Sequence, residues 1–507
     1  MRPFLTLGAH LRRHHPSRPS SLRSLSSLTT TTPAASPDAP LRVCVVGSGP
    51  SGFYTTKYLL SADDNVHVDM IESLPTPFGL IRSGVAPDHQ DVKACQNDFT
   101  QVAKSKRFSF FGNVTVGADV TVENLRQRYN AVVFCTGAAS DRMLNIPGEH
   151  LKGVHSARAV VNWYNSHPDF VTYPLDLSAA TTGTCVIIGQ GNVAVDCARI
   201  LSCQPSVLAS SDISDYALDA LEMSGINRVI MLGRRGHVQA SFTMKELREL
   251  TKLEGTTFLV TQQELDASMT EATQEEINTG RVPKRMDKLL RKVSDRSIQK
   301  EGKILELSFL KSPFEIIPSE TDPTAVGGLR VVHNSLLGPA GKQRAVSRNE
   351  EEDMFIPCDI VLRSVGYLGV PLDGVAFDNK RAVIANNSES SGRIVNLTSG
   401  EAVTGMFTSG WAKRGPSGIV GTNIPCAKET VQSILEDYSS ALLPTIQQEG
   451  GVRSVLQQQQ QQVVDWNGYI HINDHEVQVG EQKGKVRDKL FATETMLQVA
   501  NSGGAAK

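Results

Sequence analysis

Two glycine-rich turns, each placed between an apolar run and a helical stretch, constrain the fold of this 507-residue chain more than any other feature. The first turn spans residues 47–52 and follows the apolar run 42–46, whereas the second spans 189–194 and follows 184–188. A strand, a Gly-x-Gly-x-x-Gly or Gly-x-Gly-x-x-Ala turn and a helix together form the phosphate-binding turn of a Rossmann unit. The pattern therefore predicts two such units, in a chain long enough for two or three domains.

Short apolar runs alternate with helical stretches from Leu41 onward, which predicts an α/β fold with parallel strands. The clearest strands are predicted at residues 42–46, 67–72, 131–135, 185–188, 228–232, 360–364 and 405–409. Residues 313–327 and 337–353 are polar and punctuated by Gly and Pro, so we expect loops or hairpins there. The glutamine tract 457–462 is predicted to be a surface insertion or a helix extension without chemistry.

Each glycine of the first turn has a separate role in phosphate binding. Gly47 allows the tight turn, Gly49 lets the backbone approach a pyrophosphate, and Gly52 permits close packing of helix and strand. The next predicted strand ends in Glu72, 20 residues after Gly52, where a carboxylate accepts hydrogen bonds from ribose hydroxyls. The first turn is therefore interpreted as a dinucleotide site.

The second turn, with Gly189, Gly191 and Ala194, differs from the first in the charge that follows its second strand. That strand ends before Arg234 and Arg235 instead of an acid. Two guanidinium groups at this place favour a 2′-phosphate, which predicts NADP as the ligand and not NAD. The alternative is that both arginines only flank a solvated strand end. The long gap between Ala194 and Arg234 predicts an inserted helix or loop.

The first 37 residues contain five arginines, many Ser and Thr, and no acidic residue before Asp38. This composition is typical of an organelle import presequence, which we place at residues 1–37. Mitochondrial import is preferred because arginines are dense among leucines, although the Ser and Thr content leaves plastid import open. No apolar run is long enough to span a bilayer, so the protein is expected to be soluble or peripheral to a membrane.

Composition argues against nucleic-acid binding through bulk charge and against the commonest redox-disulfide and zinc sites. The 51 basic and 53 acidic residues nearly balance, which gives no support to nucleic-acid binding through bulk charge. The eight cysteines include no Cys-x-x-Cys pair, so the commonest redox-disulfide and zinc spacings are absent. We expect no metal site, and we expect the cysteines in apolar runs to be small buried hydrophobic residues.

Four strings of residues carry a resemblance to a known family: VVGSGPSGFY at 45–54, PFGLIRSGVAPDH at 77–89, GQGNVAVD at 189–196 and WAKRGPSG at 411–418. Together they resemble the adrenodoxin reductases, the mitochondrial-type ferredoxin–NADP reductases, from about Leu41 almost to the C-terminus. The resemblance implies two Rossmann-like dinucleotide-binding domains of the glutathione-reductase type. It further implies an NADP domain at 145–363 that is inserted into a split FAD domain at 41–144 and 364–507.

The resemblance also implies binding residues beyond the glycines. For FAD these are Ser51, Glu72, Leu80, Val116, Trp411, Gly418, Ile419 and Val420. For NADP they are Gln190, Gly191, Asn192, Val193, Arg234, Arg235, Glu246 and again Gly418. The chain departs from the wider flavoprotein pattern in having Trp411 where Asp usually follows Gly, so a carboxylate contact to the ribityl chain is not expected. Ser51 also stands where Ala is commoner.

The resemblance implies an FAD-containing NADPH:ferredoxin oxidoreductase that passes electrons one at a time to a small acidic 2Fe-2S ferredoxin. It would act as a monomer in the mitochondrial matrix, free or peripheral to the inner membrane. His89 and Asp196 lie in matching motifs and could pair near the flavin as catalytic residues. The alternative, a structural loop histidine and a packing carboxylate, stays equally open.

Other functions remain as alternatives at this point. A disulfide reductase needs a closely spaced cysteine pair, which this chain lacks, and an iron–sulfur electron-input subunit of the glutamate-synthase kind needs clustered cysteines. Another NADPH-dependent flavoprotein, such as a monooxygenase, and a nucleotide sensor without turnover are the remaining possibilities.

Residues 281–292 form a basic run with six basic residues and one acid, at helical spacing. Such a run is usually only a solvated helix face, but with the family resemblance it becomes the predicted docking surface for a ferredoxin. The candidate docking residues are Arg281, Lys284, Arg285 and Lys288, with Lys413 and Arg414 as further candidates beside the flavin motif.

Overall fold

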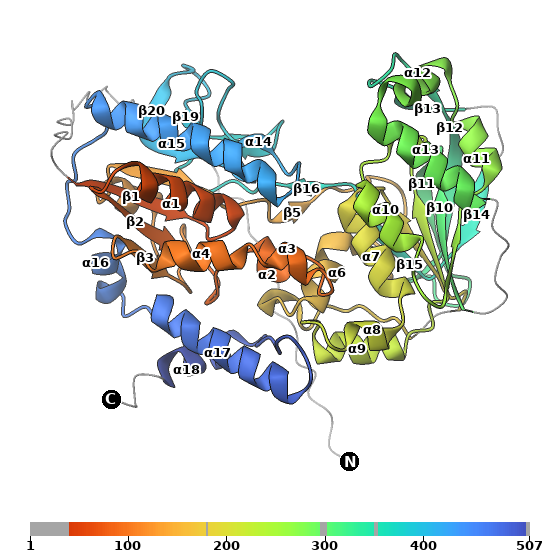
Figure 1. The fold of residues 1–507 in the computed structure, drawn as a ribbon, viewed down its shortest axis with the longest axis horizontal. Helices are drawn as coiled ribbons and strands as arrows, with labels where there is room; N and C mark the ends of the chain where they lie inside the picture. The colour runs from red at the N-terminus through yellow and green to blue at the C-terminus, as the bar shows by residue number, and fades with distance from the viewer. Residues whose placement is uncertain (1–39, 179–180, 295–301, 349–352, 503–507) are drawn as a thin grey trace. The chain divides into compact units, whose positions relative to one another are not determined.

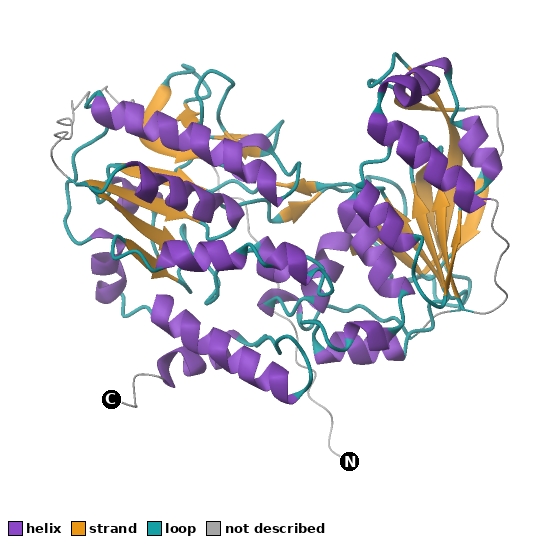
Figure 2. Ribbon diagram, viewed as in Figure 1, coloured by secondary structure: helices purple, strands orange, loops and turns teal. Residues whose placement is uncertain are grey.

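The computed structural model describes residues 40–178, 181–294, 302–348 and 353–502. The predicted presequence at 1–37 lies outside these residues. The fold has two six-stranded sheets with helices packed on them (Figures 1 and 2), and each glycine-rich turn follows a strand of one sheet. The predicted class, α/β with two Rossmann-like units, is confirmed.

The first sheet has the strand order β19-β20-β4-β1-β2-β3. All its neighbouring strands pair in parallel except β19, which is antiparallel to β20. Strand β1 is buried along nearly its whole length, as expected of a parallel strand with both faces covered. The strands are β1 (Leu41–Val46), β2 (Val66–Ile71), β3 (Phe108–Phe111), β4 (Ala131–Phe134), β19 (Arg393–Val395) and β20 (Ala402–Thr408).

The second sheet is parallel throughout, in the order β6-β15-β7-β8-β10-β9. Its strands are β6 (Val154–Ser156), β7 (Thr184–Ile188), β8 (Arg228–Leu232), β9 (Thr256–Leu259), β10 (Lys303–Ser308) and β15 (Ile360–Arg363). The seven strands predicted from the sequence are therefore all present, and no predicted end differs from the observed one by more than three residues.

The described residues of the polar stretches 313–327 and 337–353 lie in antiparallel strands and the turns that join them, and hairpins are one of the two outcomes expected. The four strands are β11 (Lys311–Pro318), β12 (Val326–Leu337), β13 (Arg344–Ser347) and β14 (Met354–Pro357). Ile316, Leu329 and Val331 pack with Val186 and Ile230 in one apolar cluster. The hairpin sheet thus covers one face of the second parallel sheet.

Helices α1 (Pro50–Ala62) and α7 (Asn192–Ser202) begin within the two glycine turns, directly after the second glycine of each. Pro50 at the first helical position suits a helix start, because proline lacks the N–H that has no partner there. Helices α8 (Pro205–Leu208) and α9 (Asp215–Glu222) fill the gap predicted between Ala194 and Arg234.

The remaining helices lie on the sheets or in the C-terminal part of the chain (Figure 1). They are α2 (Leu80–Ser83), α3 (Gln90–Lys93), α4 (Gln96–Ala103), α5 (Val122–Arg126), α6 (Ala157–Tyr164), α10 (Met244–Leu250), α11 (Gln262–Ala267), α12 (Glu271–Thr279), α13 (Arg281–Ser294), α14 (Trp411–Arg414), α15 (Asn423–Ser439), α16 (Gly451–Gln458), α17 (Trp466–Gln482) and α18 (Thr493–Ser502). Short 3₁₀ turns occur at Pro168–Phe170, His237–Gln239 and Val420–Thr422.

The chain passes between the two large sheets twice, and the two connecting segments pair with each other. Strand β5 (Ser140–Asp141) is antiparallel to β16 (Tyr367–Leu368). The predicted domain limits after residues 144 and 363 lie close to these strands, and they stay a prediction.

Seven of the eight cysteines are buried and Cys95 is partly buried, and all are free thiols, as expected for small hydrophobic residues. Among the described helices, none combines the length and the apolar character needed to cross a membrane.

Candidate cofactor and active site

The first glycine turn is shaped by close backbone contacts. Gly47 has φ +103°, and its N–H donates to the Ile71 carbonyl at 2.8 Å. A Cβ at Gly47 would lie 2.6 Å from the carbonyl oxygen of Cys135, and one at Gly52 would lie 2.0 Å from that of Gly47. These two positions therefore accept no larger residue, in agreement with the roles predicted for them.

Gly49 has a different environment, because a Cβ there would meet no atom within 4 Å. It precedes helix α1, whose first turn has no side-chain cap, so its main-chain donors are available. Open space beside free amides at a helix N-terminus fits the pyrophosphate of a dinucleotide.

Glu72 lies directly after β2 and is held against the first turn. Its Oε2 accepts from the hydroxyl of Ser48 at 2.6 Å and from the Ser48 N–H at 3.0 Å. Its Oε1 accepts from the N–H of Leu74 at 3.2 Å. The carboxylate thus stands at the carboxyl edge of the sheet, the position that the ribose interaction requires.

The other residues predicted to hold FAD come from four segments. The side chains of Leu80 and Ile419 are apolar yet 36% and 62% exposed. Ser51 is buried and its hydroxyl has no hydrogen-bond partner. Gly410, which precedes Trp411, approaches so closely that a Cβ there would lie 2.5 Å from the Ser51 Cβ. Exposed apolar side chains and an unpaired buried hydroxyl beside one glycine turn fit a bound flavin nucleotide.

The remaining residues predicted to hold FAD are Val116, Trp411, Gly418 and Val420. Val116 and Val420 are partly buried, whereas Gly418 is exposed and has φ +80°. The indole N–H of Trp411 donates to the Ser417 carbonyl at 3.2 Å, which fixes the loop before Gly418.

The second glycine turn repeats the geometry of the first. Gly189 has φ +129°, and a Cβ there would lie 2.2 Å from the Ser364 carbonyl oxygen. At Gly191, by contrast, a Cβ would meet nothing within 4 Å. Asn192 accepts from the Thr243 N–H at 3.1 Å, while Val193 is partly buried beneath it. The open position is again the one predicted to face a pyrophosphate.

Gln190 and the two arginines lie at the ends of adjacent strands. The Gln190 amide donates to the Ser308 carbonyl at 3.1 Å and packs against Gly233. Arg234 is exposed and Arg235 partly buried, and neither guanidinium forms a hydrogen bond or ion pair with a described residue. Partial burial, and then the neighbouring Arg234, lower the pKa of Arg235. Two adjacent cations without a partner fit a 2′-phosphate better than a free hydroxyl.

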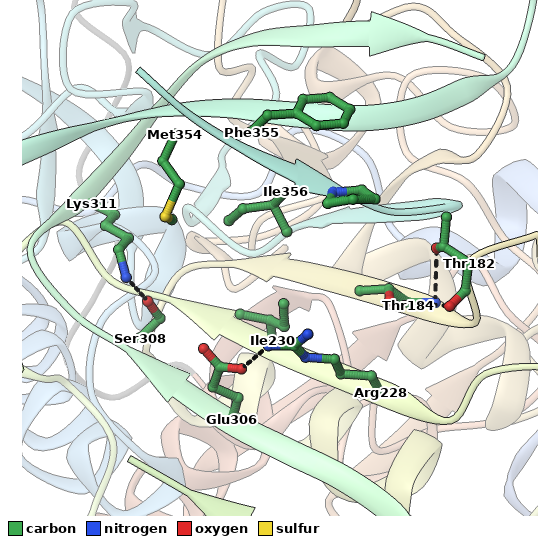
Figure 3. A pocket seen from close by; sticks show the side chains of 11 residues that line it. Thr182, Thr184, Arg228, Ile230, Glu306, Ser308, Lys311, Met354, Phe355 and Ile356 are labelled. Carbon is green, nitrogen blue, oxygen red and sulfur yellow. Dashed lines mark hydrogen bonds and ion pairs between the residues drawn. The ribbon is translucent and has the colours of Figure 1, made fainter. Parts of the chain in front are cut away.

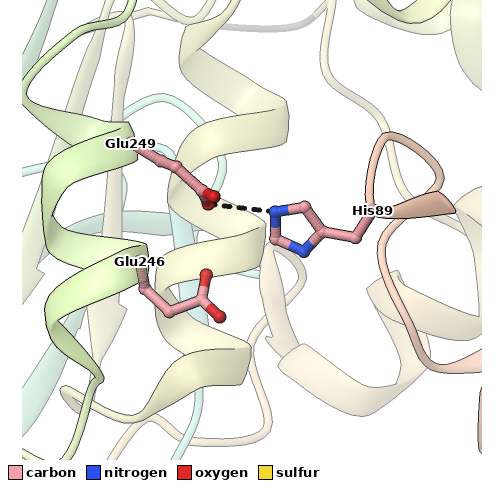
Figure 4. Close-up of side chains that lie close together, drawn as sticks. All are labelled: His89, Glu246 and Glu249. Atoms are coloured by element: carbon pink, nitrogen blue, oxygen red, sulfur yellow. Dashed lines mark hydrogen bonds and ion pairs between the residues drawn. The ribbon is translucent and has the colours of Figure 1, made fainter. Parts of the chain in front are cut away.

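His89 and Glu246 lie together with Glu249, a residue that was not predicted (Figure 4). Asp196 lies near the other ring nitrogen of His89. His89 Nε2 lies 3.0 Å from Glu249 Oε2, and its Nδ1 lies 3.8 Å from Asp196 Oδ1. The Glu246 oxygen Oε2 is buried and has no hydrogen-bond partner. His89 therefore pairs more closely with Glu249 than with Asp196, the partner considered from the sequence.

Burial affects the pKa of two carboxyl groups in this cluster. It raises the pKa of Asp196 well above the usual value, and the neighbouring Glu246 and Glu249 raise it further. Burial likewise raises the pKa of Glu246. Arg199 is the buried counterion, with Nη2 at 2.6 Å from Asp196 and Nη1 in contact with Asp88. His89, Glu246 and Glu249 lie close enough to hold a metal ion, but the site holds no other feature that requires one.

The basic run forms helix α13 as predicted. Arg281, Lys284, Arg285 and Lys288 are exposed, and none of the four forms an ion pair with a described residue. Met286, Leu290 and Val293 are buried beneath them. The further candidates differ, because Lys413 is only 7% exposed and binds Glu429 at 2.8 Å. Arg414 binds Ser417, Thr422 and Asn423. Both side chains already have partners, on α15 or in the loop after Trp411, so they are poor docking cations.

A pocket of about 430 Å³ lies between the second parallel sheet and the hairpin strand β14 (Figure 3). Its charged side chains already have partners, since Arg228 binds Glu306 at 2.5 Å and Lys311 binds Ser308 at 2.7 Å. None of the predicted cofactor residues lines it, so we do not assign it to the active site.

Comparison with known proteins identifies relatives that are reductases, in keeping with the two glycine turns. Residues 41–251 match the family model described as "Pyridine nucleotide-disulphide oxidoreductase". The NADPH:adrenodoxin oxidoreductase of Arabidopsis thaliana is 42% identical, over 91% of this chain and 95% of its own length. NADPH-ferredoxin reductase FprA of Mycobacterium tuberculosis is 40% identical, over 91% and 99%. The chain belongs to this family of NADPH:adrenodoxin and NADPH–ferredoxin reductases.

A solved structure of Mycobacterium tuberculosis FprA in complex with NADPH superimposes with a TM-score of 0.82, at 39% identity, covering 91% of this chain and 99% of that one. Members of the reductase family are FAD-dependent enzymes that use NADPH, so the chain is an oxidoreductase with these two cofactors. The contributions of single residues to binding and catalysis stay predictions.

Glu249, Arg199 and Asp88 were not singled out from the sequence. Glu249 lies one helical turn after Glu246 on α10, so the two carboxylates share a face. That spacing was a usable signal. The partner of Glu249, however, is His89, which lies 160 residues away in the sequence, and no local pattern connects the two.

Proposed function

We propose that the protein is an FAD-containing NADPH:ferredoxin oxidoreductase that passes electrons one at a time to a small acidic 2Fe-2S ferredoxin. The observation that carries the proposal is the asymmetry between its two glycine turns. Glu72 bonds Ser48, next to the open position at Gly49. Arg234 and Arg235, which pair with no described residue, follow β8, the neighbour of the strand that leads to the open position at Gly191. One turn thus suits a free ribose and the other a 2′-phosphate.

The flavin, when bound, accepts hydride from NADPH and returns single electrons, which a ferredoxin requires. The chain's own residues bind and orient the two nucleotides. Ser51, Glu72, Leu80, Val116 and the segment 418–420 form the FAD site. Gln190–Val193, Arg234, Arg235 and Glu246 form the NADP site.

His89, the residue immediately before α3, contacts Glu249 on α10, and this contact joins the segments that carry the two sites. The paired carboxylate holds the imidazole in one orientation, and Asp196 stands on the opposite side of the ring. This arrangement can hold a proton at His89 Nδ1 or Nε2, in the manner of a base with an orienting partner. Hydride transfer itself requires no proton donor.

The partner is proposed to dock on helix α13. An acidic ferredoxin would meet Arg281, Lys284, Arg285 and Lys288, whose charges no described carboxylate neutralises. Such a surface increases the association rate and the specificity more than the affinity.

The protein is proposed to act as a monomer in the mitochondrial matrix, free or peripheral to the inner membrane. Relatives from plants, fishes and mammals are named mitochondrial, although FprA belongs to a bacterium. The arginine-rich, acid-free segment 1–37 supports import.

The test mixes the FAD-loaded protein with NADPH and a mitochondrial 2Fe-2S ferredoxin, with cytochrome c as the final acceptor. We expect flavin absorbance to bleach with NADPH under anaerobic conditions, and cytochrome c reduction to depend on ferredoxin. NADPH consumption that requires an organic substrate and ignores ferredoxin would indicate a monooxygenase instead. Absence of bleaching would indicate a nucleotide sensor.

A further inference from the structure

The glutamine tract ends in contact with the turn that follows strand β3. Gly112 and Val464 form an antiparallel bridge, with N–H to O distances of 2.8 and 3.0 Å. The side-chain amide of Gln461 donates to the Asn113 carbonyl at 2.9 Å, and the Asn113 side chain donates to the Gln462 carbonyl at 2.8 Å. The end of the tract is therefore fastened to this turn, whereas residues 457–460 are exposed.

The turn at Gly112 and Asn113 has little freedom of its own. Asn113 has φ +60°, a left-handed conformation that asparagine adopts more readily than most residues. A Cβ at Gly112 would lie 3.0 Å from the Pro75 carbonyl oxygen and 3.1 Å from that of Leu74. The turn is thus pressed against the loop that follows Glu72.

A series of direct contacts leads from Gln461 to Glu72. Asn113, whose carbonyl accepts from Gln461, donates its N–H to the Leu74 carbonyl at 3.0 Å. Leu74 in turn donates its N–H to Glu72 Oε1 at 3.2 Å. The main-chain carbonyl of Glu72 accepts from the Val114 N–H at 2.9 Å. Both the side chain and the backbone of Glu72 therefore depend on the position of this turn.

We propose that Gln461 is a positioning residue of the FAD site. It fixes the Gly112–Asn113 turn and, through Leu74, holds the Glu72 carboxylate where the adenosine ribose binds. The same turn begins the segment that carries Val116, so its displacement would affect two FAD contacts. The tract was predicted to lack chemistry, but in this arrangement its end preorganises a binding site.

The test measures FAD release from the holoenzyme. Gln461→Ala and Gln461→Met both remove the amide donor, and Met keeps the length of the side chain. Because one neutral hydrogen bond is lost, we expect the rate of FAD dissociation, followed by recovery of free-flavin fluorescence, to rise about fivefold. Gln459→Ala is the matched control, because the Gln459 side chain is exposed and makes no hydrogen bond to a described residue.

A second measurement separates positioning from a loss of general stability. If Gln461 positions Glu72, the gap in Tm between the FAD-loaded and FAD-free proteins shrinks in Gln461→Met, while the Tm of the FAD-free protein stays near wild type. If Gln461 only supports the fold, both melting temperatures fall together and the gap is kept, which overturns the proposal.

A double-mutant cycle tests whether Gln461 acts on FAD binding through Glu72. In a Glu72→Gln background the effect of Gln461→Met on FAD release should largely disappear, because both changes disturb the same interaction. Fully additive effects, or unchanged FAD release in both single variants at Gln461, would reject the inference. These measurements need no ferredoxin, so their outcome is independent of the partner proposed above.

Discussion

The ammonium group of Lys93 lies 2.7 Å from both carboxylate oxygens of Asp212, and Lys489 approaches the same carboxylate at 3.3 Å. All three side chains are buried. Burial alone would raise the pKa of Asp212, but the attraction of Lys489 and Lys93 outweighs it and holds the pKa at about 2. Burial lowers the pKa of both lysines. One carboxylate thus compensates two buried cations.

Asp212→Asn should therefore be strongly destabilising. Two buried ammonium groups would face a neutral amide, which costs about 3–5 kcal/mol in the free energy of unfolding. Because the pKa of Asp212 is depressed, its contribution is complete above pH 4 and is lost as the pH falls to about 2. Urea titrations of the wild type and Asp212→Asn should give a difference in the free energy of unfolding that narrows as the pH falls from 4 to about 2. Asp215→Asn is the control, since its side chain is 49% exposed and should cost far less.

Gly49→Ala and Gly191→Ala form a reciprocal pair of tests for the two nucleotide sites. A methyl group at either position meets no protein atom, so both variants should fold normally by circular dichroism. Gly49→Ala should lose FAD and keep NADP+ binding, whereas Gly191→Ala should keep FAD and bind NADP+ at least tenfold more weakly, because the new methyl blocks a pyrophosphate. Loss of the same ligand from both variants would contradict the assignment.

Arg234 and Arg235 should determine the preference for NADPH over NADH. Each charge-assisted hydrogen bond to the 2′-phosphate contributes about 1.5–3 kcal/mol, so changing both arginines to Ala should raise the KM for NADPH about a hundredfold or more. The KM for NADH should change little, because NADH has no phosphate at this position. An equal rise in the KM for both nucleotides would show that the two arginines stabilise the fold and do not bind the phosphate.

Helix α13 is the site at which charge should control ferredoxin reduction. Arg285→Glu should lower kcat/KM for ferredoxin about tenfold at low salt and weaken its dependence on ionic strength. Direct reduction of ferricyanide by NADPH, which needs no docking, should be unchanged. Lys252→Glu, an exposed position outside this helix, serves as the control. Ferredoxin reduction that does not slow as salt rises would refute docking through charge.

The contact between His89 and Glu249 should affect the reduction of the flavin by NADPH. Glu249→Gln removes the ionic partner of the imidazole, and loss of one charge-assisted hydrogen bond should slow anaerobic bleaching about tenfold or more. Because the two residues act as a pair, the double variant His89→Gln/Glu249→Gln should be little slower than the slower single variant. Stopped-flow absorbance provides the measurement, and fully additive effects would show that the residues act separately.

The sequence was sufficient for those parts of the fold that depend on local constraints. The apolar run at 42–46 is β1, and Gly47 and Gly52 sit where a Cβ would collide with a carbonyl oxygen. Only glycine can occupy such positions, so they can be recognised in the sequence. The position of Arg234 and Arg235 after β8 follows from the same strand periodicity.

Contacts between distant segments could not be predicted in this way. His89 meets Glu249, and Gln461 meets Asn113, across separations of 160 and 348 residues. The register that brings them together is set by helix packing and by a loop, not by a repeat along the chain. For the same reason the glutamine tract was predicted to lack chemistry, because its composition gives no indication of what its last residues touch.

Strand β4 lies between β1 and β20 in the first sheet, and β20 begins at Ala402, long after β4 ends at Phe134. During synthesis one edge of β4 therefore stays unpaired until residues 402–408 have been made. Unpaired edges promote aggregation, so folding should require protection of this edge by a chaperone. In a protein that crosses a membrane unfolded, this edge would be unpaired twice, once during synthesis at the ribosome and once during refolding after import.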